Sequence, residues 1–230
     1  MARLTKRAKA MNELVKEVKE LGIKEAIAIL KKAPATKFDQ TVEVALHLNV
    51  DQATVPIRGT VTLPHGTGKK TRVAVFCKGD FVEKAQSAGA DFVGGDDLLK
   101  KVSEGWLDFD VAVTTPDMMK DLAKLGKVLG PRGLMPNPKS GTVTTEIAKA
   151  VKELKAGKIE YRMDKQSGVT GPVGKLSFSE EALMDNVTAF VRSVIMSSPK
   201  LQKGQNVKSI SISSTMGPGI KLEKNQFREG

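Results

Sequence analysis

The stretch TVEVALHLNV, residues 41–50, decides the class of fold at this end of the chain. Apolar side chains at positions 42, 44, 46, 48 and 50 alternate with Thr41, Glu43, Ala45, His47 and Asn49. Side chains of a β-strand point alternately to the two faces of a sheet, so this pattern predicts a half-buried strand with one polar face. Residues 57–63 repeat the alternation and predict a second strand, which ends before Pro64.

Two helical patterns precede this strand. Apolar residues at positions 4, 8, 11, 15 and 18 recur at helical spacing until Gly22, and residues 24–33 predict a shorter helix that Pro34 ends. Alternating strands return beyond Gly157, in residues 159–163 and 173–178. Ser179 then begins an amphipathic helix. The last predicted strand is VKSISISST, residues 207–215, whose hydroxyl side chains at positions 209, 211, 213 and 215 share one face.

The middle of the chain follows another pattern. TRVAVFCKG, residues 71–79, is a short apolar run that is typical of a strand buried on both faces. Further strand patterns at 90–95 and 109–115 alternate with helical patterns at 81–88, 96–106, 116–125 and 145–156. This alternation with short connections predicts a parallel α/β sheet with helices on both faces.

Each flank of this middle part holds about 70 residues, a length at which a separate core is marginal. Both flanks combine alternating strands with amphipathic helices. We therefore expect residues 1–66 and 158–230 to form one discontinuous α+β domain, into which residues 67–157 are inserted as an α/β domain. Glycines 66, 68 and 157 would lie in the two segments that connect these domains. A chain that simply divides in two near position 66 is the alternative.

The charge balance favours a polyanionic partner. The chain has 230 residues with 37 basic and 26 acidic side chains, a net charge of +11. Basic side chains that neutralise phosphates release condensed counterions, although an excess of charge also serves solubility. Aromatic residues make up only 4%, too few for a surface built on base stacking. No signal peptide or apolar run of about 20 residues is present, so we expect a cytoplasmic protein without a membrane partner.

Catalytic and metal-binding motifs are scarce. The segment HGTGKKT, residues 65–71, resembles a Walker loop only in part. If Gly68 is the second glycine of that motif, Leu63 occupies the position of the first glycine, and Lys70 occupies the position that needs Ser or Thr. The single cysteine, Cys77, excludes a disulfide framework and a Cys-rich zinc site. Neither histidine has a metal-ligand neighbour at the required spacing. We expect no enzymatic activity, metal or cofactor; the alternative is an enzyme that binds a small molecule at the carboxyl ends of the middle strands.

Two polar patches and one unusual segment suggest contact with RNA. Lys37 and Phe38 precede the first strand, and SISSTMGPG ends the last strand with Thr215, Met216 and Gly217. Short hydroxyl side chains and bare backbone amides suit the minor groove of folded RNA, whereas an ordinary solvated edge is the alternative.

Residues 125–144 carry four glycines, three prolines, Lys127, Arg132 and Lys139 without any acidic residue. We expect this segment to be irregular. Its glycines allow close backbone approach and its basic side chains favour phosphate, which indicates RNA or protein contact. A merely rigid connection is the alternative.

Six segments follow one another in an order that resembles the L-one family of bacterial large-subunit ribosomal proteins. They are TKFDQTVEVALHL, RGTVTLPHGTGK, GADFVGGDDL, LGKVLGPRGLMPNPKSGTVT, KAGKIEYRMDK and STMGPG. The resemblance covers nearly the whole chain. It implies an RNA-binding domain made from both termini and an inserted Rossmann-like domain without a nucleotide. It also implies binding to a folded region of large-subunit rRNA, a mobile stalk that helps deacylated tRNA leave the exit site, and repression through the protein's own mRNA.

Residue by residue, the resemblance implies an RNA surface of Lys37, Phe38, Thr41, Glu43, Arg162, Asp164, Ser209, Ser211, Thr215, Met216 and Gly217. Lys37 and Arg162 would meet phosphate, and the hydroxyls and the Gly217 amide would meet sugar and base edges. Phe38 and Met216 would supply flat apolar contact. Glu43 and Asp164 would accept hydrogen bonds from 2′-hydroxyls or hold basic neighbours.

A second contact with RNA or tRNA would use Arg132 and Lys139. The chain departs from the family pattern at Met163, where Asn is usual, at Thr170, where His is expected, and in the shorter link of residues 51–59. We expect the free protein to be a monomer. A general nucleic-acid chaperone, which would bind any duplex and lose affinity steeply with salt, is the alternative within the class of nucleic-acid-binding proteins.

Overall fold

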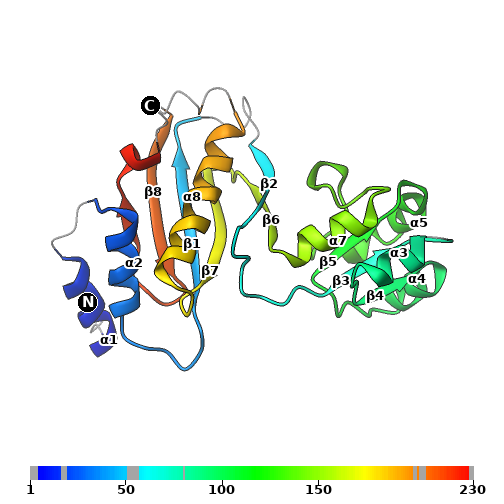
Figure 1. The fold of residues 1–230 in the computed structure, drawn as a ribbon, viewed down its shortest axis with the longest axis horizontal. Helices are drawn as coiled ribbons and strands as arrows, with labels where there is room; N and C mark the ends of the chain where they lie inside the picture. Colours follow the sequence, from blue (N-terminus) through cyan, green and yellow to red (C-terminus); the bar gives the residue numbers. More distant parts are fainter. Residues whose placement is uncertain are drawn as a thin grey trace. The chain divides into compact units, whose positions relative to one another are not determined.

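The chain folds into two compact units of mixed α/β structure, which confirms the predicted class (Figure 1). The structure is a computed structural model, and it describes residues 5–16, 20–50, 57–79, 81–198, 201 and 206–227. The first unit combines Met1–Gly68 with Ile159–Gly230, and the second unit is Lys69–Lys158.

A four-stranded antiparallel sheet forms the centre of the first unit, in the order β7-β1-β8-β9. Its strands are β1 (Thr41–Leu48), β7 (Gly168–Lys175), β8 (Val207–Ser214) and β9 (Ile220–Leu222). The second strand of the sequence, β2 (Arg58–Thr62), does not join this sheet and pairs with β6 (Lys158–Arg162). The short strand β9, which the sequence did not predict, extends the sheet beside β8.

The alternation in β1 produces the predicted two-faced strand. Val42, Val44, Leu46 and Leu48 are buried, whereas Glu43 and Ala45 are exposed on the opposite face. In β8 the alternation breaks near Val207, which is nevertheless buried. The pairing of β1 with β8 shifts register between positions 47 and 48, so the bulge absorbs one extra residue and returns this side chain to the core.

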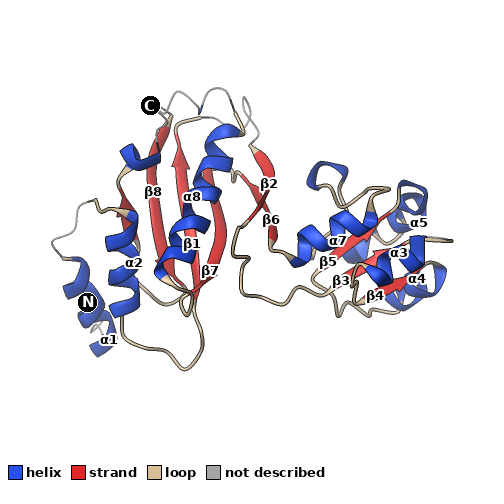
Figure 2. Cartoon of the chain, in the orientation of Figure 1, coloured by secondary structure: helices blue, strands red, loops and turns tan. Residues whose placement is uncertain are grey.

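Two helices cover the apolar face of this sheet, α2 (Ile23–Lys32) and α8 (Glu180–Met196) (Figure 2). They pack against each other and against the strands, and their buried side chains belong to the same core cluster as the strand residues. The Ser179 side chain caps α8 as predicted, since it accepts a hydrogen bond from the Ala182 amide at 3.2 Å. With both helices on one face, the polar face of the sheet remains open.

The first helical pattern forms α1 (Lys6–Val15), which Thr5 caps. No side chain of α1 is fully buried, so its apolar spacing does not lead to core packing of the kind seen in α2. Positions 4 and 18 of the pattern lie outside the described residues. Of the described helices, none combines the length and the apolarity that a membrane span requires.

The second unit is built on a parallel three-stranded sheet in the order β4-β3-β5. The strands are β3 (Val73–Phe76), β4 (Phe92–Gly94) and β5 (Val111–Thr114). Successive β3 side chains enter two different clusters, because Val73 and Val75 face α3 (Phe81–Ser87) and α7 (Ile147–Lys155), and Ala74 and Phe76 face the other side. On that side lie α4 (Asp96–Ser103), α5 (Met119–Ala123) and α6 (Gly126–Leu129). Helices therefore cover both faces, as the alternation predicted.

Two sequence predictions in this unit are confirmed only in part. The predicted helix over 116–125 is a 3-10 turn, Pro116–Met118, followed by the short α5. The segment 125–144 is partly regular, because it contains α6 and a second 3-10 turn, Pro138–Ser140. Short buried side chains fold this segment back on itself: the Thr142 hydroxyl accepts from the Asn137 amide at 2.8 Å and donates to its carbonyl at 3.1 Å.

A buried asparagine holds the segment that follows β2 in place within the first unit. The side chain of Asn186, on α8, is fully buried and accepts a hydrogen bond from the His65 amide at 3.1 Å. Its amide group donates to the carbonyls of Gly66 and Val173 at 2.9 and 2.7 Å. Gly66 and Gly68 both have positive φ, 64° and 73°, so glycine suits these two positions.

Candidate nucleic-acid interface

The first predicted strand and the last one meet through a pair of threonines. The Thr41 amide donates a hydrogen bond of 3.0 Å to the Thr215 hydroxyl, and the Thr215 amide donates one of 3.0 Å to the Thr41 carbonyl. The Thr41 hydroxyl accepts a further bond from the Lys175 ammonium at 2.9 Å. The structure thus brings two predicted site residues together and adds a basic side chain that the sequence reasoning missed.

The backbone amides of the turn that follows β8 already have acceptors within the protein. The Gly217 amide donates to the Ser214 carbonyl at 2.9 Å, and the Met216 amide donates to the side-chain oxygen of Gln40 at 2.9 Å. The Gly217 amide, which the resemblance assigns to RNA contact, is thus already used inside the turn. The turn presents the exposed side chains of Thr215 and Met216.

Gly217 is required by space rather than by an unusual backbone angle. A Cβ atom at this position would collide with the Ser214 hydroxyl oxygen and approach the Ser214 Cβ to 3.3 Å. That hydroxyl is buried and has no hydrogen-bond partner among the described residues. The close approach explains why the turn needs glycine.

Lys37 and Phe38 lie in the connection before β1, where the Thr36 hydroxyl donates to the Phe38 carbonyl at 2.7 Å. Phe38 and Met216 are 54% and 53% exposed, although large apolar side chains are ordinarily covered. Near the same turn, the Arg7 guanidinium of α1 donates to the Met216 carbonyl at 3.3 Å. Exposed apolar side chains beside cationic groups suit contact with nucleosides and phosphates.

The open face of the sheet carries the remaining predicted hydroxyl residues. Glu43 is exposed and pairs in register with Ser213, and Ser211 pairs with Ala45. Ser209 pairs with His47, which the alternation places on the same polar face. The sequence reasoning found no metal-ligand partner for His47 and gave it no role in RNA binding, but the pairing places it beside the predicted hydroxyls.

Asp164 has a structural task that the resemblance did not imply. Its carboxylate oxygen Oδ1 accepts hydrogen bonds from the amides of Gln166 and Gly168 at 2.8 and 2.7 Å, and this closes the turn between β6 and β7. Ser167, within the turn, has φ of 63°, which is uncommon for a residue other than glycine. Arg162, at the end of β6, is exposed. Asp164 therefore shapes the turn next to this basic side chain.

The two single-residue departures from the family pattern lie in different environments. Met163 is buried in the core, where its amide donates to the Ile57 carbonyl at 2.9 Å. Thr170 is exposed on β7, in register with Ala45 of β1. The replacement at Thr170 thus changes the polar face of the sheet, whereas the one at Met163 changes the core. The first six residues of the shorter link, 51–56, lie outside the described residues.

Arg132 and Lys139 belong to the second unit, unlike the other predicted site residues. Both are exposed. Lys139 lies in a short turn that Asn137 caps, since the Asn137 side chain accepts from the Lys139 amide at 2.9 Å. The predicted residues therefore form one group on the first unit and a separate pair on the second.

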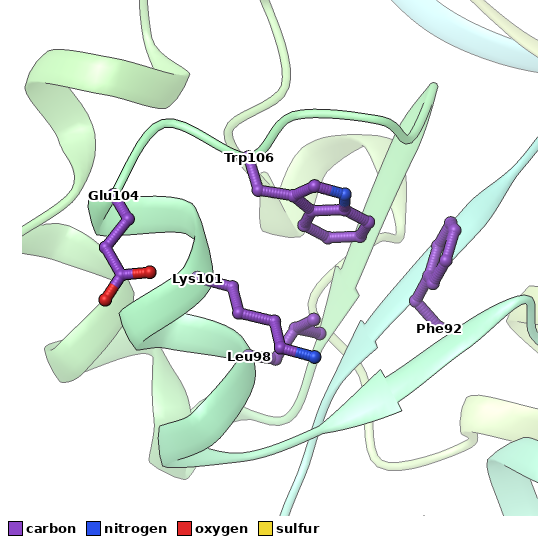
Figure 3. A pocket seen from close by; sticks show the side chains of 5 residues that line it. All are labelled: Phe92, Leu98, Lys101, Glu104 and Trp106. Carbon is purple, nitrogen blue, oxygen red and sulfur yellow. The ribbon is translucent and has the colours of Figure 1, made fainter.

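The described part of the second unit contains a hollow of the size that a small molecule could enter. It measures about 470 Å³ and is lined by Phe92, Leu98, Lys101, Glu104 and Trp106. The Phe92 and Trp106 rings pack edge to face with their centroids 4.7 Å apart, and Figure 3 shows Glu104 apart from both rings. Phe92 begins β4 and Glu104 follows α4, so the hollow lies near the amino end of a strand. Ligands of open parallel sheets bind instead at the carboxyl ends.

Other chemistry associated with enzymes finds little support in the described part of the chain. Burial raises the pKa of the Cys77 thiol, which disfavours the nucleophilic thiolate. No group of three His, Cys, Asp or Glu side chains among the described residues could hold a metal ion. The threonine pair, the closed turn and the open hydroxyl face remain the best-defined candidate site.

Comparison with known proteins shows the family to which the chain belongs. The sequence profile of the family described as "Ribosomal protein L1p/L10e family" matches residues 30–218. The chain is also 53% identical over 225 residues to the "Large ribosomal subunit protein uL1" of Protochlamydia amoebophila (strain UWE25), and the match covers 97% of this chain and 95% of that protein. The class defined by these matches is that of ribosomal proteins. The chain belongs to the ribosomal protein L1p/L10e family, which confirms the resemblance stated from the sequence.

Proposed function

We propose that this protein is a structural, non-enzymatic rRNA-binding component of the large ribosomal subunit. Membership of the ribosomal protein L1p/L10e family is the observation that carries the proposal, and the relative from Protochlamydia amoebophila is named for the same subunit. The net charge of +11 suits a polyanionic partner. In the cell, the protein would be cytoplasmic and associated with ribosomes.

The RNA-binding domain of this proposal is the discontinuous one of residues 1–66 and 158–230, with residues 67–157 as an inserted Rossmann-like domain. Support comes from the two compact units, whose boundaries lie within two residues of these limits. The RNA surface would combine Lys37, Phe38, Thr41, Glu43, Arg162, Ser209, Ser211, Thr215 and Met216, with Asp164 and Gly217 shaping two of its turns. The hydroxyl groups and the carbonyl oxygens of the turn would accept or share hydrogen bonds with 2′-hydroxyls, and the basic residues would meet phosphates.

A mobility-shift titration tests the proposal directly. The intact protein is titrated against a folded fragment of large-subunit rRNA and against a plain RNA duplex of equal length, at several salt concentrations. We expect the rRNA fragment to bind at least about 100-fold more tightly, since specific complexes exceed non-specific ones by such factors. Equal affinity for both RNAs, with a steep loss in salt for each, would instead identify a general nucleic-acid chaperone.

We further propose that the protein forms the mobile stalk near the exit site, assists release of deacylated tRNA, and represses translation of its own mRNA. These roles rest on the family resemblance, and the exposed Arg132 and Lys139 provide basic side chains on the second unit for a tRNA contact. Ribosomes reconstituted without the protein should release deacylated tRNA more slowly than complete ones. The protein's own mRNA should compete with the rRNA fragment in the mobility-shift assay, and failure to compete would exclude a repressor that uses the same surface.

A further inference from the structure

We propose that Gln40 is a positioning residue for RNA recognition, because its side chain holds the turn of residues 215–217 in the shape that the RNA contacts. The inference rests on the proposed function and identifies a residue outside the predicted surface on which that surface depends. Gln40 would act through Met216 rather than by touching RNA itself.

The position of Gln40 in the fold is the first observation. It immediately precedes β1 and is only 2% exposed, one of few polar side chains buried in the described part of the first unit. Its backbone carbonyl accepts a hydrogen bond from the Leu176 amide at 2.8 Å, just beyond the end of β7. Its side-chain oxygen accepts the Met216 amide at 2.9 Å, just beyond the end of β8. One residue therefore joins the ends of three neighbouring strands.

The hydrogen bonds of the turn show why this contact matters. The Thr215 amide is held by the Thr41 carbonyl and the Gly217 amide by the Ser214 carbonyl, so both have backbone acceptors. The Met216 amide lies between them, and a side chain from another strand supplies its acceptor. Leaving a partly buried amide without an acceptor costs free energy, so without Gln40 the turn would rotate this donor toward water.

The exposure of the Met216 side chain links this geometry to RNA binding. Met216 is 53% exposed and makes a poor anchor for its own backbone, because half of its surface faces solvent. The direction of its side chain is set by the backbone on either side. The hydrogen bond from the Met216 amide to Gln40 therefore holds the Met216 and Thr215 side chains outward in one conformation. This reduces the conformational entropy that the turn loses when it binds RNA.

Two substitutions separate positioning from a merely structural role. Gln40→Leu keeps a side chain of similar size but removes the acceptor. Gln40→Glu keeps an acceptor oxygen at the same place, and its charge strengthens the hydrogen bond to an amide. As a control, Thr114→Val removes a buried side-chain hydrogen bond in the second unit, from the Thr114 hydroxyl to the Phe76 carbonyl at 3.2 Å, and Thr114 is not a residue of the proposed surface.

The experiment measures the dissociation constant for the rRNA fragment, the melting temperature, and the exchange rate of the Met216 amide hydrogen in the free protein. We expect Gln40→Leu to weaken binding about tenfold and to accelerate exchange of that amide about tenfold, in line with the loss of one hydrogen bond. Gln40→Glu should stay within about threefold of the wild type in both, and Thr114→Val should lower the melting temperature without changing affinity.

Wild-type affinity of Gln40→Leu for the rRNA fragment would overturn the inference. Equal weakening by Gln40→Leu and Gln40→Glu would overturn it too, since the acceptor would not be the cause. A wild-type protein that shows no preference for the rRNA fragment would refute the proposed function instead. In that case the exchange rate of the Met216 amide still reports whether Gln40 holds the turn, so the two failures are distinguishable.

Discussion

Thr215 and Thr41 lie 174 positions apart in the sequence and are joined by reciprocal hydrogen bonds of 3.0 Å, each through the other's backbone or hydroxyl group. The bonds connect the first residue of β1 to the residue that follows β8. A surface that needs both residues exists only when the two ends of the chain fold together.

Replacing Met216 should weaken RNA binding without loss of stability. Met216→Ala removes an exposed side chain, so we expect affinity for the rRNA fragment to fall by about 1–3 kcal/mol with an unchanged melting temperature.

Thr215→Val should weaken binding similarly and also destabilise the fold by about 1 kcal/mol, because the hydroxyl exchanges hydrogen bonds with Thr41. Titration and thermal unfolding measure the two effects, and wild-type affinity in both variants would remove these residues from the surface.

Gly217 and Ser214 should show strong coupling in a double-mutant cycle. Gly217→Ala places a Cβ atom against the Ser214 hydroxyl and should destabilise the turn by about 1–3 kcal/mol through overpacking. Ser214→Ala removes a buried hydroxyl that has no described partner, so we expect it to be neutral or slightly stabilising. The double variant should recover at least half of the loss. Additive effects in urea unfolding would show that another contact makes glycine necessary.

Asp110 should make the second unit sensitive to acid. Its carboxylate accepts a hydrogen bond from Lys69 at 2.8 Å and bonds from the amide and side chain of Arg72, and these lower the pKa of Asp110 from 3.8 to about 2, with Lys69 as the largest cause. Because the folded state favours the ionised form, this stabilisation is complete above about pH 4 and is lost as the pH falls toward 2.

Asp110→Asn should therefore destabilise the second unit by about 1 kcal/mol at pH 7 and have little effect near pH 2. We discount the full pKa difference because the Lys69 and Arg72 side chains are mostly exposed and screened by solvent. Fluorescence of Trp106, the single tryptophan, reports urea unfolding of this unit. The exposed neighbour Asp108 provides the control, since Asp108→Asn should leave the curve unchanged. A difference that stays constant from pH 7 to pH 2 would contradict the assignment.

Removing the second unit should leave a folded RNA-binding domain. The core cluster of the first unit contains no residue of 69–158, and the two clusters of the second unit contain no residue outside that range. A chain in which a short Gly/Ser linker replaces residues 69–158 should show cooperative unfolding by circular dichroism and should bind the rRNA fragment with an affinity within about tenfold of the intact protein. An unfolded product would contradict the discontinuous-domain proposal.

Local patterns predicted the elements whose environment repeats along the chain. The alternation in residues 41–50 predicted the buried and open faces of β1, and the apolar run around Val75 predicted a strand covered on both faces. Short elements were harder. The helix expected over 116–125 became a 3-10 turn and α5, and β9 was not predicted, because three to five residues carry too little periodicity to be distinguished from a loop.

The candidate site, too, could be predicted from the sequence only in part. The motifs around Thr41 and Thr215 pointed to their residues, but the use of the Gly217 amide inside the turn and the role of Asp164 in a tight connection depended on distances that no spacing contains. Gln40 did leave a signal in the sequence: counted along the alternation, it falls on the buried face beside Val42, where a polar side chain requires a hydrogen-bond partner. The sequence did not show that the partner is Met216.

The amino-acid sequence alone determined the longer strands and helices, which side of the alternating strands avoids water, and to which family the chain is similar. These properties depend on the order of apolar and polar side chains over a few residues, which is fully present in the sequence. Only the tertiary structure decided which amides of the 215–217 turn are already occupied, why position 217 must be glycine, and that Gln40 supports Met216. Those outcomes depend on contacts between β1 and β8, and a hydrogen bond between residues more than 170 positions apart forms only when these two strands pair.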